Sequence, residues 1–67
     1  MFSKKLLAEQ LIGMQFGSGK SLRKSAKEIG ISASTLSRLN NQQIIPDLDT
    51  FYKCAKWCGV ELDYFFI

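Results

Sequence analysis

Histidine is absent from this chain of 67 residues, proline occurs once and cysteine twice. Without histidine the commonest general base is missing, and helix capping explains the dispersed acidic residues, so we expect no enzymatic activity. The single proline and the five scattered glycines leave no room for a linker. The length therefore predicts one domain over residues 1–67.

The two cysteines, Cys54 and Cys58, cannot complete a tetrahedral zinc site without further ligands. Their spacing of four residues places both on one face of a helix, which is poor geometry for a disulfide and suits packing in a core. The sequence also lacks a signal peptide and an apolar run of membrane-spanning length. We expect a soluble protein of the reducing cytoplasm, with no metal, no cofactor and no membrane association.

Charge is divided unevenly along the chain, whose net charge is +3. Residues 1–45 carry seven basic and two acidic residues, a net charge of +5. Residues 46–67 carry two basic and four acidic residues, a net charge of −2. The division favours a polyanion as the partner of the basic part and a different partner for the acidic end. A solvated surface with random variation in sign is the alternative.

Apolar residues recur with helical rather than strand spacing, between residues that begin and end helices. Ser3 is expected to cap a first helix that reaches about Phe16, and residues 17–19 then end it. The residues of this helix expected to face the core are Leu7, Leu11 and Met14, with Leu6 beside them.

The segment 22–41, LRKSAKEIGISASTLSRLNN, predicts two short helices joined by a tight turn. Ser21 and Ser32 are the expected N-caps of helices over 22–29 and from 33 to about 40. Gly30 supplies the left-handed residue of the turn, and Ala26 is small enough for a close helix crossing. The expected apolar anchors of the motif are Ile29, Ile31, Leu36 and Leu39.

Two further helices are expected after a polar loop over 40–46. The fourth helix begins at Asp47 and ends at Gly59, and its expected core positions are Leu48, Phe51, Ala55 and Cys58. A last short helix runs from Leu62 to about Phe66. The predicted fold class is all-α, a compact domain of five helices.

These segments resemble the λ-repressor-like helix-turn-helix domain of the Cro and repressor type (XRE-like), found in phage and bacterial regulators. SLRKSAKEIGISASTLSRL is similar to that family's second and third helices, and PDLDTFYKCAKWCGVELDYFF is similar to its fourth and fifth. Two positions depart from the pattern. Ser25 stands where the family is usually apolar, and Leu22 where many members carry a glutamine that meets a phosphate. The resemblance implies a sequence-specific transcription regulator, most simply a repressor, that binds double-stranded DNA without a cofactor.

The resemblance also implies that the third helix lies in the major groove with its N-terminal half at the base edges. Arg38 is the one residue able to make a bidentate contact with guanine, and a phosphate contact or a surface ion pair is the alternative. Alanine and serine are weakly selective, so DNA shape and water share the specificity. The implied base-reading residues are Ala33, Ser34, Ser37 and Arg38.

Contacts to phosphates are expected around the rim of the motif. The N-terminus of the helix over 22–29 presents unpaired N–H groups and the positive end of its dipole. Thr35 either binds a phosphate or closes a helix turn. The expected phosphate-binding residues are Lys20, Ser21, Leu22, Arg23, Lys24, Lys27, Thr35, Asn40, Asn41 and Gln43.

The last residues of the chain are too apolar for a domain of this size to bury them all. We expect a homodimer through the C-terminal region, whose recognition helices reach successive major grooves and read a palindrome. The expected interface residues are Trp57, Tyr64, Phe65, Phe66 and Ile67. The alternative function is an antitoxin-like or protein-interaction module with the same fold, in which DNA binding is secondary.

Overall fold

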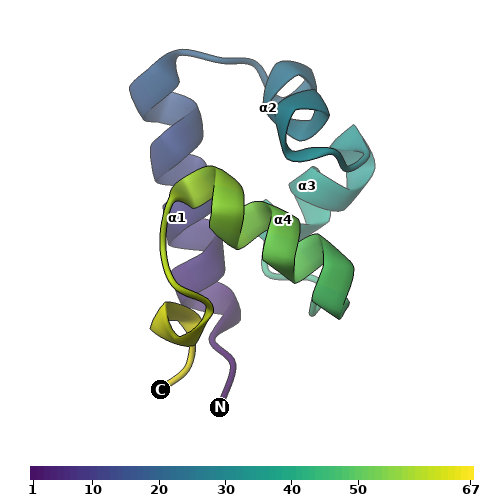
Figure 1. Ribbon diagram of the computed structural model, residues 1–67. Helices are drawn as coiled ribbons and strands as arrows, with labels where there is room; N and C mark the ends of the chain where they lie inside the picture. Colours follow the sequence, from purple (N-terminus) through teal and green to yellow (C-terminus); the bar gives the residue numbers. More distant parts are fainter.

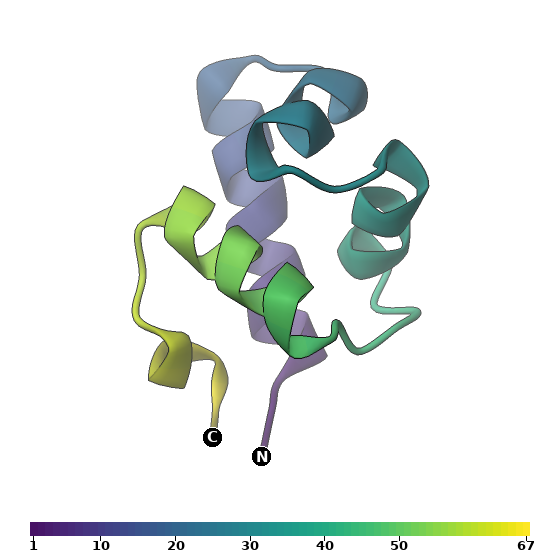
Figure 2. The same cartoon turned by 45° about the vertical axis from the view of Figure 1, so that its right-hand side comes forward.

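The computed structural model describes all 67 residues, and every regular element in it is helical (Figure 1). Helix α1 is the long element against which α3 and α4 pack, and α2 lies on α3 and α4 (Figures 1 and 2). The elements are α1 Lys4–Ser18, α2 Leu22–Ile29, α3 Ala33–Asn40, α4 Leu48–Cys58 and the 3-10 helix η1 Leu62–Phe65.

The all-α fold is confirmed, but the predicted fifth helix is only one 3-10 turn, so the protein has four α-helices. The turn ends at Phe65, because Phe66 adopts an extended backbone and forms an antiparallel bridge with Phe2. The four residues of η1 are a length typical of a 3-10 helix.

Each α-helix begins at the capping residue expected from the sequence. In every case the cap's side-chain oxygen accepts a hydrogen bond from the N–H three residues later, and the caps are Ser3, Ser21, Ser32 and Asp47. Helix α1 runs two residues further than predicted, to Ser18, because Gly17 stays helical. The left-handed residue that ends it is Gly19, with φ 65°.

One face of each helix contributes to a single core. Two residues predicted to lie in the core, Met14 and Leu48, are exposed. Met14 lies in the last turns of α1, which extend past α4 (Figure 1). Leu48 is the first residue of α4 and is 77% exposed. Ala8 and Cys54 are buried instead. The core cluster consists of Leu7, Leu11, Ala26, Ile29, Leu36, Leu39, Phe51, Cys54, Ala55 and Phe65.

The two ends of the chain lie side by side below α1 and α4 (Figure 1). The Ser3 N–H donates to the Phe65 carbonyl at 2.7 Å, and the Ile67 N–H donates to the Met1 carbonyl at 2.9 Å. The ring of Phe51 packs edge-on against those of Phe2 and Phe65, at centroid distances of 5.2 and 5.5 Å. Phe65 is fully buried, so its assignment to a dimer interface is wrong.

Ser25 is the one buried polar residue, and its hydroxyl has no hydrogen-bond partner. It lies on the buried face of α2 beside Ala26 and Ile29. A buried hydroxyl without a partner loses its hydrogen bonds to water and gains nothing in return. The Ser25 side chain therefore weakens the core.

Replacement Ser25→Ala is expected to raise the free energy of unfolding by about 1–2 kcal/mol, because it removes the unpaired hydroxyl. Urea denaturation measures the change. Ser37→Ala, at a half-buried position of α3, is the control and should gain only the difference in helix propensity, about 0.5 kcal/mol. Equal gains in the two variants would contradict the prediction.

Candidate nucleic-acid interface

The connection between α2 and α3 has the tight geometry expected from the sequence. The Ala26 carbonyl accepts hydrogen bonds from the N–H groups of Gly30, at 2.9 Å, and Ile31, at 3.0 Å. Gly30 has φ 93°, a left-handed backbone that other residues adopt only with strain. Lys53 of α4 donates to the Gly30 carbonyl at 3.5 Å. The start of α3 is therefore fixed relative to both α2 and α4.

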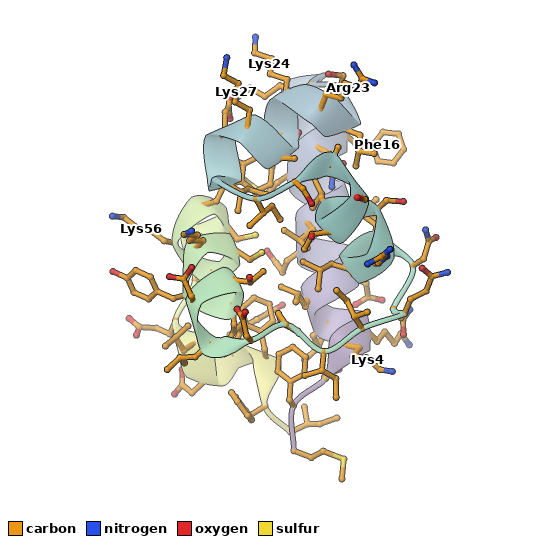
Figure 3. All side chains as sticks on the ribbon, turned by 90° about the vertical axis from the view of Figure 1, so that its right-hand side faces the viewer. Lys4, Phe16, Arg23, Lys24, Lys27 and Lys56 are labelled. Atoms are coloured by element: carbon orange, nitrogen blue, oxygen red, sulfur yellow. The ribbon has the colours of Figure 1, made fainter.

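Helix α3 turns one face away from the core, toward the viewer in Figure 3. Ser34 and Arg38 lie one turn apart on this face and are exposed, while Ala33 and Ser37 are half-buried. Arg38 takes part in neither of the protein's two ion pairs. Its guanidinium is free to donate to an external acceptor.

Three cations project from the neighbouring helix α2. Figure 3 shows Arg23, Lys24 and Lys27 along its outer side, above α3, and all three are exposed and outside the ion pairs. With Ser21 and Glu28 they line a shallow hollow that contains no hydrophobic side chain. Close cations without carboxylate partners form a surface suited to phosphate groups.

Lys20 differs from these three cations because it has a partner in the fold. Its Nζ donates to Glu28 Oε1 at 2.7 Å, and Trp57 Nε1 donates to the same oxygen at 3.2 Å. These hydrogen bonds hold the pKa of Glu28 below its usual value. The arrangement joins the start of α2, its last turn and the end of α4. A phosphate would have to compete with Glu28 for Lys20.

Asn40 and Thr35 are also engaged within the protein. Gln15 Nε2 donates to Asn40 Oδ1 at 3.1 Å, and Asn40 Nδ2 donates back to Gln15 Oε1 at 3.4 Å, which ties α1 to the end of α3. Thr35 Oγ1 accepts from Ser32 Oγ at 2.8 Å and so closes the first turn of α3. Nothing in the sequence points to Gln15, because its partner lies 25 residues away.

The remaining predicted phosphate ligands lie at the ends of α2 and α3. The first N–H groups of a helix have no carbonyl partner within the helix. In α2 the Lys24 N–H donates to Ser21 Oγ, and the N–H groups of Leu22 and Arg23 stay without intrahelical partners. Asn41 is exposed beyond α3 and donates to the Ser37 carbonyl at 2.9 Å. A further exposed amide beyond the helix belongs to Gln43.

The C-terminal residues predicted as a dimer interface fall into separate environments. Trp57 is half-buried and bonded to Glu28, and the Tyr64 hydroxyl accepts from Gln10 at 3.2 Å. Phe66 and Ile67 remain exposed at the chain end. Only this last pair presents apolar surface without a polar partner.

The two thiols lie among apolar side chains. Burial raises the pKa of Cys54 to about 12 and that of Cys58 to about 11, so both are protonated at neutral pH. A protonated thiol is a poor nucleophile and a poor metal ligand. No group of three or more His, Cys, Asp or Glu side chains lies close enough to hold a metal ion, and no helix is both long and apolar enough to cross a membrane.

Two short helices at a fixed crossing, with a free face on the second and free cations on the first, define a helix-turn-helix domain. The profile of the family described as Helix-turn-helix matches residues 18–65, and the chain belongs to this family, in its Cro/C1, XRE-like type. The family consists of DNA-binding regulators, and its ligand is double-stranded DNA. No curated protein and no solved structure matches the chain significantly.

Replacement Glu28→Gln is expected to reduce the loss of stability in acid. Because the pKa of Glu28 is lowered in the folded protein, its contribution is present above the unfolded value of 4.5 and is lost as pH falls through the folded pKa. The free energy of unfolding of the wild type should thus fall more steeply below about pH 5 than that of Glu28→Gln.

Urea denaturation at a series of pH values measures both slopes. Asp47 also has a lowered pKa, because its carboxylate accepts the Thr50 N–H, so the variant keeps part of the fall. Glu9→Gln, at an exposed position of α1 outside both ion pairs, should follow the wild type. Parallel curves for Glu28→Gln and the wild type would disprove the role given to Glu28.

Proposed function

We propose that the protein is a sequence-specific transcriptional repressor that binds a palindromic DNA site with α3 in the major groove. One observation carries this proposal: Arg38, exposed and outside both ion pairs, lies on the face of α3 turned away from the core, and α2, which packs against α3, carries three more exposed and unpaired cations. Bound in this way, the protein would occlude a promoter. Two free thiols fit a location in the reducing cytoplasm.

Base reading on this proposal depends mainly on Arg38. Its guanidinium can donate two hydrogen bonds to O6 and N7 of one guanine, a contact that discriminates by about 1–3 kcal/mol. Ser34 and Ser37 can donate or accept, and the Ala33 methyl group can meet the methyl group of a thymine. With so few long side chains on α3, the shape of the DNA contributes to the choice of site.

Phosphate binding is assigned first to Arg23, Lys24 and Lys27, the exposed cations of α2. The free N–H groups of Leu22 and Arg23 at the start of α2 add donors that point along the helix axis. Ser21, Asn41 and Gln43 complete the rim. Lys20, Thr35 and Asn40 are placed second, because each already bonds to another side chain, whereas Ser21 and Asn41 bond only to backbone groups.

Binding to a mixed-sequence duplex is expected to weaken steeply as salt rises, and the double variant Arg23→Ala/Lys27→Ala should lower the slope of log K against log salt by about 1.8. Arg38→Ala should instead lose about 1–3 kcal/mol of preference for a selected site over mixed sequence. Fluorescence anisotropy measures both quantities.

Lys56→Ala is the matched control, because Lys56 is exposed on α4 and lies apart from α3 and the α2 cations in Figure 3. Its slope and preference should equal those of the wild type. An affinity that does not change between low and moderate salt would refute the proposed contacts. Failure of the wild type to bind heparin or duplex at low salt would favour a protein-interaction module that uses the same fold without DNA.

Self-association is proposed through an apolar surface around the paired chain ends. Phe66 contacts Phe51 of α4 at a centroid distance of 6.0 Å, and Leu48 lies one turn before Phe51. Large contiguous patches of exposed apolar residues are rare on monomeric proteins and usually mark an interaction site. The residues assigned to this surface are Met1, Leu48, Phe66 and Ile67, and a second copy is the proposed occupant.

Replacement Leu48→Glu is expected to prevent dimerisation on DNA while leaving the fold intact, because Leu48 is exposed and an acidic residue is favourable in the first turn of a helix. Sedimentation of the protein–duplex complex measures the stoichiometry. Selection from a random duplex pool should recover an inverted repeat with half-sites about 34 Å apart.

The control for this experiment is Tyr52→Glu, which places the same charge at another exposed position of α4. It should still bind as two copies per duplex. A wild-type complex with one copy per duplex, together with selected sites that lack a repeat, would exclude the homodimer.

A further inference from the structure

Phe16 is an aromatic residue whose exposure the fold does not explain. It lies near the end of α1, and its side chain is 83% exposed. Figure 3 shows the ring projecting beside α3, on the same side of the molecule as Arg23. No aromatic ring packs against it, whereas the phenylalanines near the chain ends all have such partners.

Phe16 forms one wall of an open groove between α1 and α3, here named the α1–α3 groove. The groove has a volume of about 460 Å³. Its lining combines an apolar side with amide and hydroxyl groups, and no carboxylate takes part. The lining residues are Ile12, Gln15, Phe16, Lys20, Leu22, Ser37, Asn40 and Asn41.

The position of this groove connects it with the proposed DNA surface. Ser37 lies in the C-terminal half of α3, and Asn41 follows the last residue of that helix. Leu22 is the first residue of α2, and its N–H lacks an intrahelical partner. A strand that passes from the α2 cations to the end of α3 therefore crosses the mouth of the groove. Free N–H groups at the start of α2, beside a lining that has no carboxylate, complement a polyanion rather than an acidic or neutral peptide.

We propose that the α1–α3 groove binds one deoxyribose of the DNA backbone, at the edge of the site read by α3. The sugar ring has an apolar face that can pack on Phe16, while its flanking phosphates meet the Asn41 amide and the free N–H groups of α2. Phe16 is thus a contact residue outside the helix-turn-helix itself. The inference rests on the proposed DNA binding and adds α1 to the surface.

An apolar contact to a sugar has a signature that separates it from a phosphate contact. It removes apolar surface from water without releasing counterions. Phe16→Ala should therefore weaken binding to a mixed-sequence duplex by about tenfold and leave the salt slope unchanged. Arg23→Ala should instead lower the salt slope by about 0.9.

Hydroxyl-radical footprinting on a duplex selected by the wild type tests the position of the contact directly, because these radicals attack exposed deoxyribose. In the Phe16→Ala complex, at saturating protein, protection should disappear at the nucleotide flanking each half-site and persist in the centre. Phe16→Leu keeps an apolar side chain and should keep most of the protection. Tyr52→Ala, which truncates another exposed aromatic residue on α4, should match the wild type in affinity and footprint.

The outcomes separate this inference from the proposed function. If the wild type does not bind duplex at low salt, DNA binding itself fails. If the wild type binds and Phe16→Ala binds with the same affinity and footprint, the groove does not hold a sugar, and Phe16 is left for a protein partner. Circular dichroism should show that both Phe16 variants keep the wild-type helix content, as expected for an exposed side chain.

Discussion

The left-handed turn at Gly30 is the constraint on which the arrangement of α2 and α3 depends. Because the Ala26 carbonyl accepts both the Gly30 and Ile31 N–H groups, the chain turns within three residues, and α3 begins at Ala33 with Ser32 as its N-cap. Ala26 and Leu36 are both buried in the single core, so the crossing of the two helices is fixed by packing as well as by the backbone. A side chain at position 30 would strain this backbone whatever the space around it.

Polar contacts between distant segments then decide which groups of the motif are free. The Gln15–Asn40 amide pair joins α1 to the end of α3, and the Glu28 carboxylate accepts hydrogen bonds from both Lys20 and Trp57. Each contact uses a group that a sequence motif alone would assign to DNA or to a partner. The unpaired cations are left on the outer side of α2 and on the free face of α3, which concentrates positive charge where a phosphate backbone would pass.

The site could be predicted from the sequence where it depends on local spacing. Ser34 and Arg38 lie four residues apart, so any helix over this segment places them on one face, and the structure leaves both exposed. Local spacing does not reveal the partners of Lys20 and Asn40, because Glu28 lies 8 residues from Lys20 and Gln15 lies 25 residues from Asn40. Met14 and Leu48 have core spacing but lie where no helix covers them, and helical spacing does not reveal where a neighbouring helix ends.

Sequence alone determined the positions of the four α-helices, because the residues that begin and end them form hydrogen bonds within a few residues. The four N-caps and the terminal glycines Gly30 and Gly59 lie where the sequence predicts them. It also determined the helix-turn-helix, through Ala26 and Gly30. Tertiary structure decided that the last turn is a 3-10 helix followed by a bridge between Phe66 and Phe2, that Phe65 is core, and that Phe16 borders a groove. These features depend on contacts between residues far apart in the chain, whose geometry is set only when α1, α3 and α4 pack together.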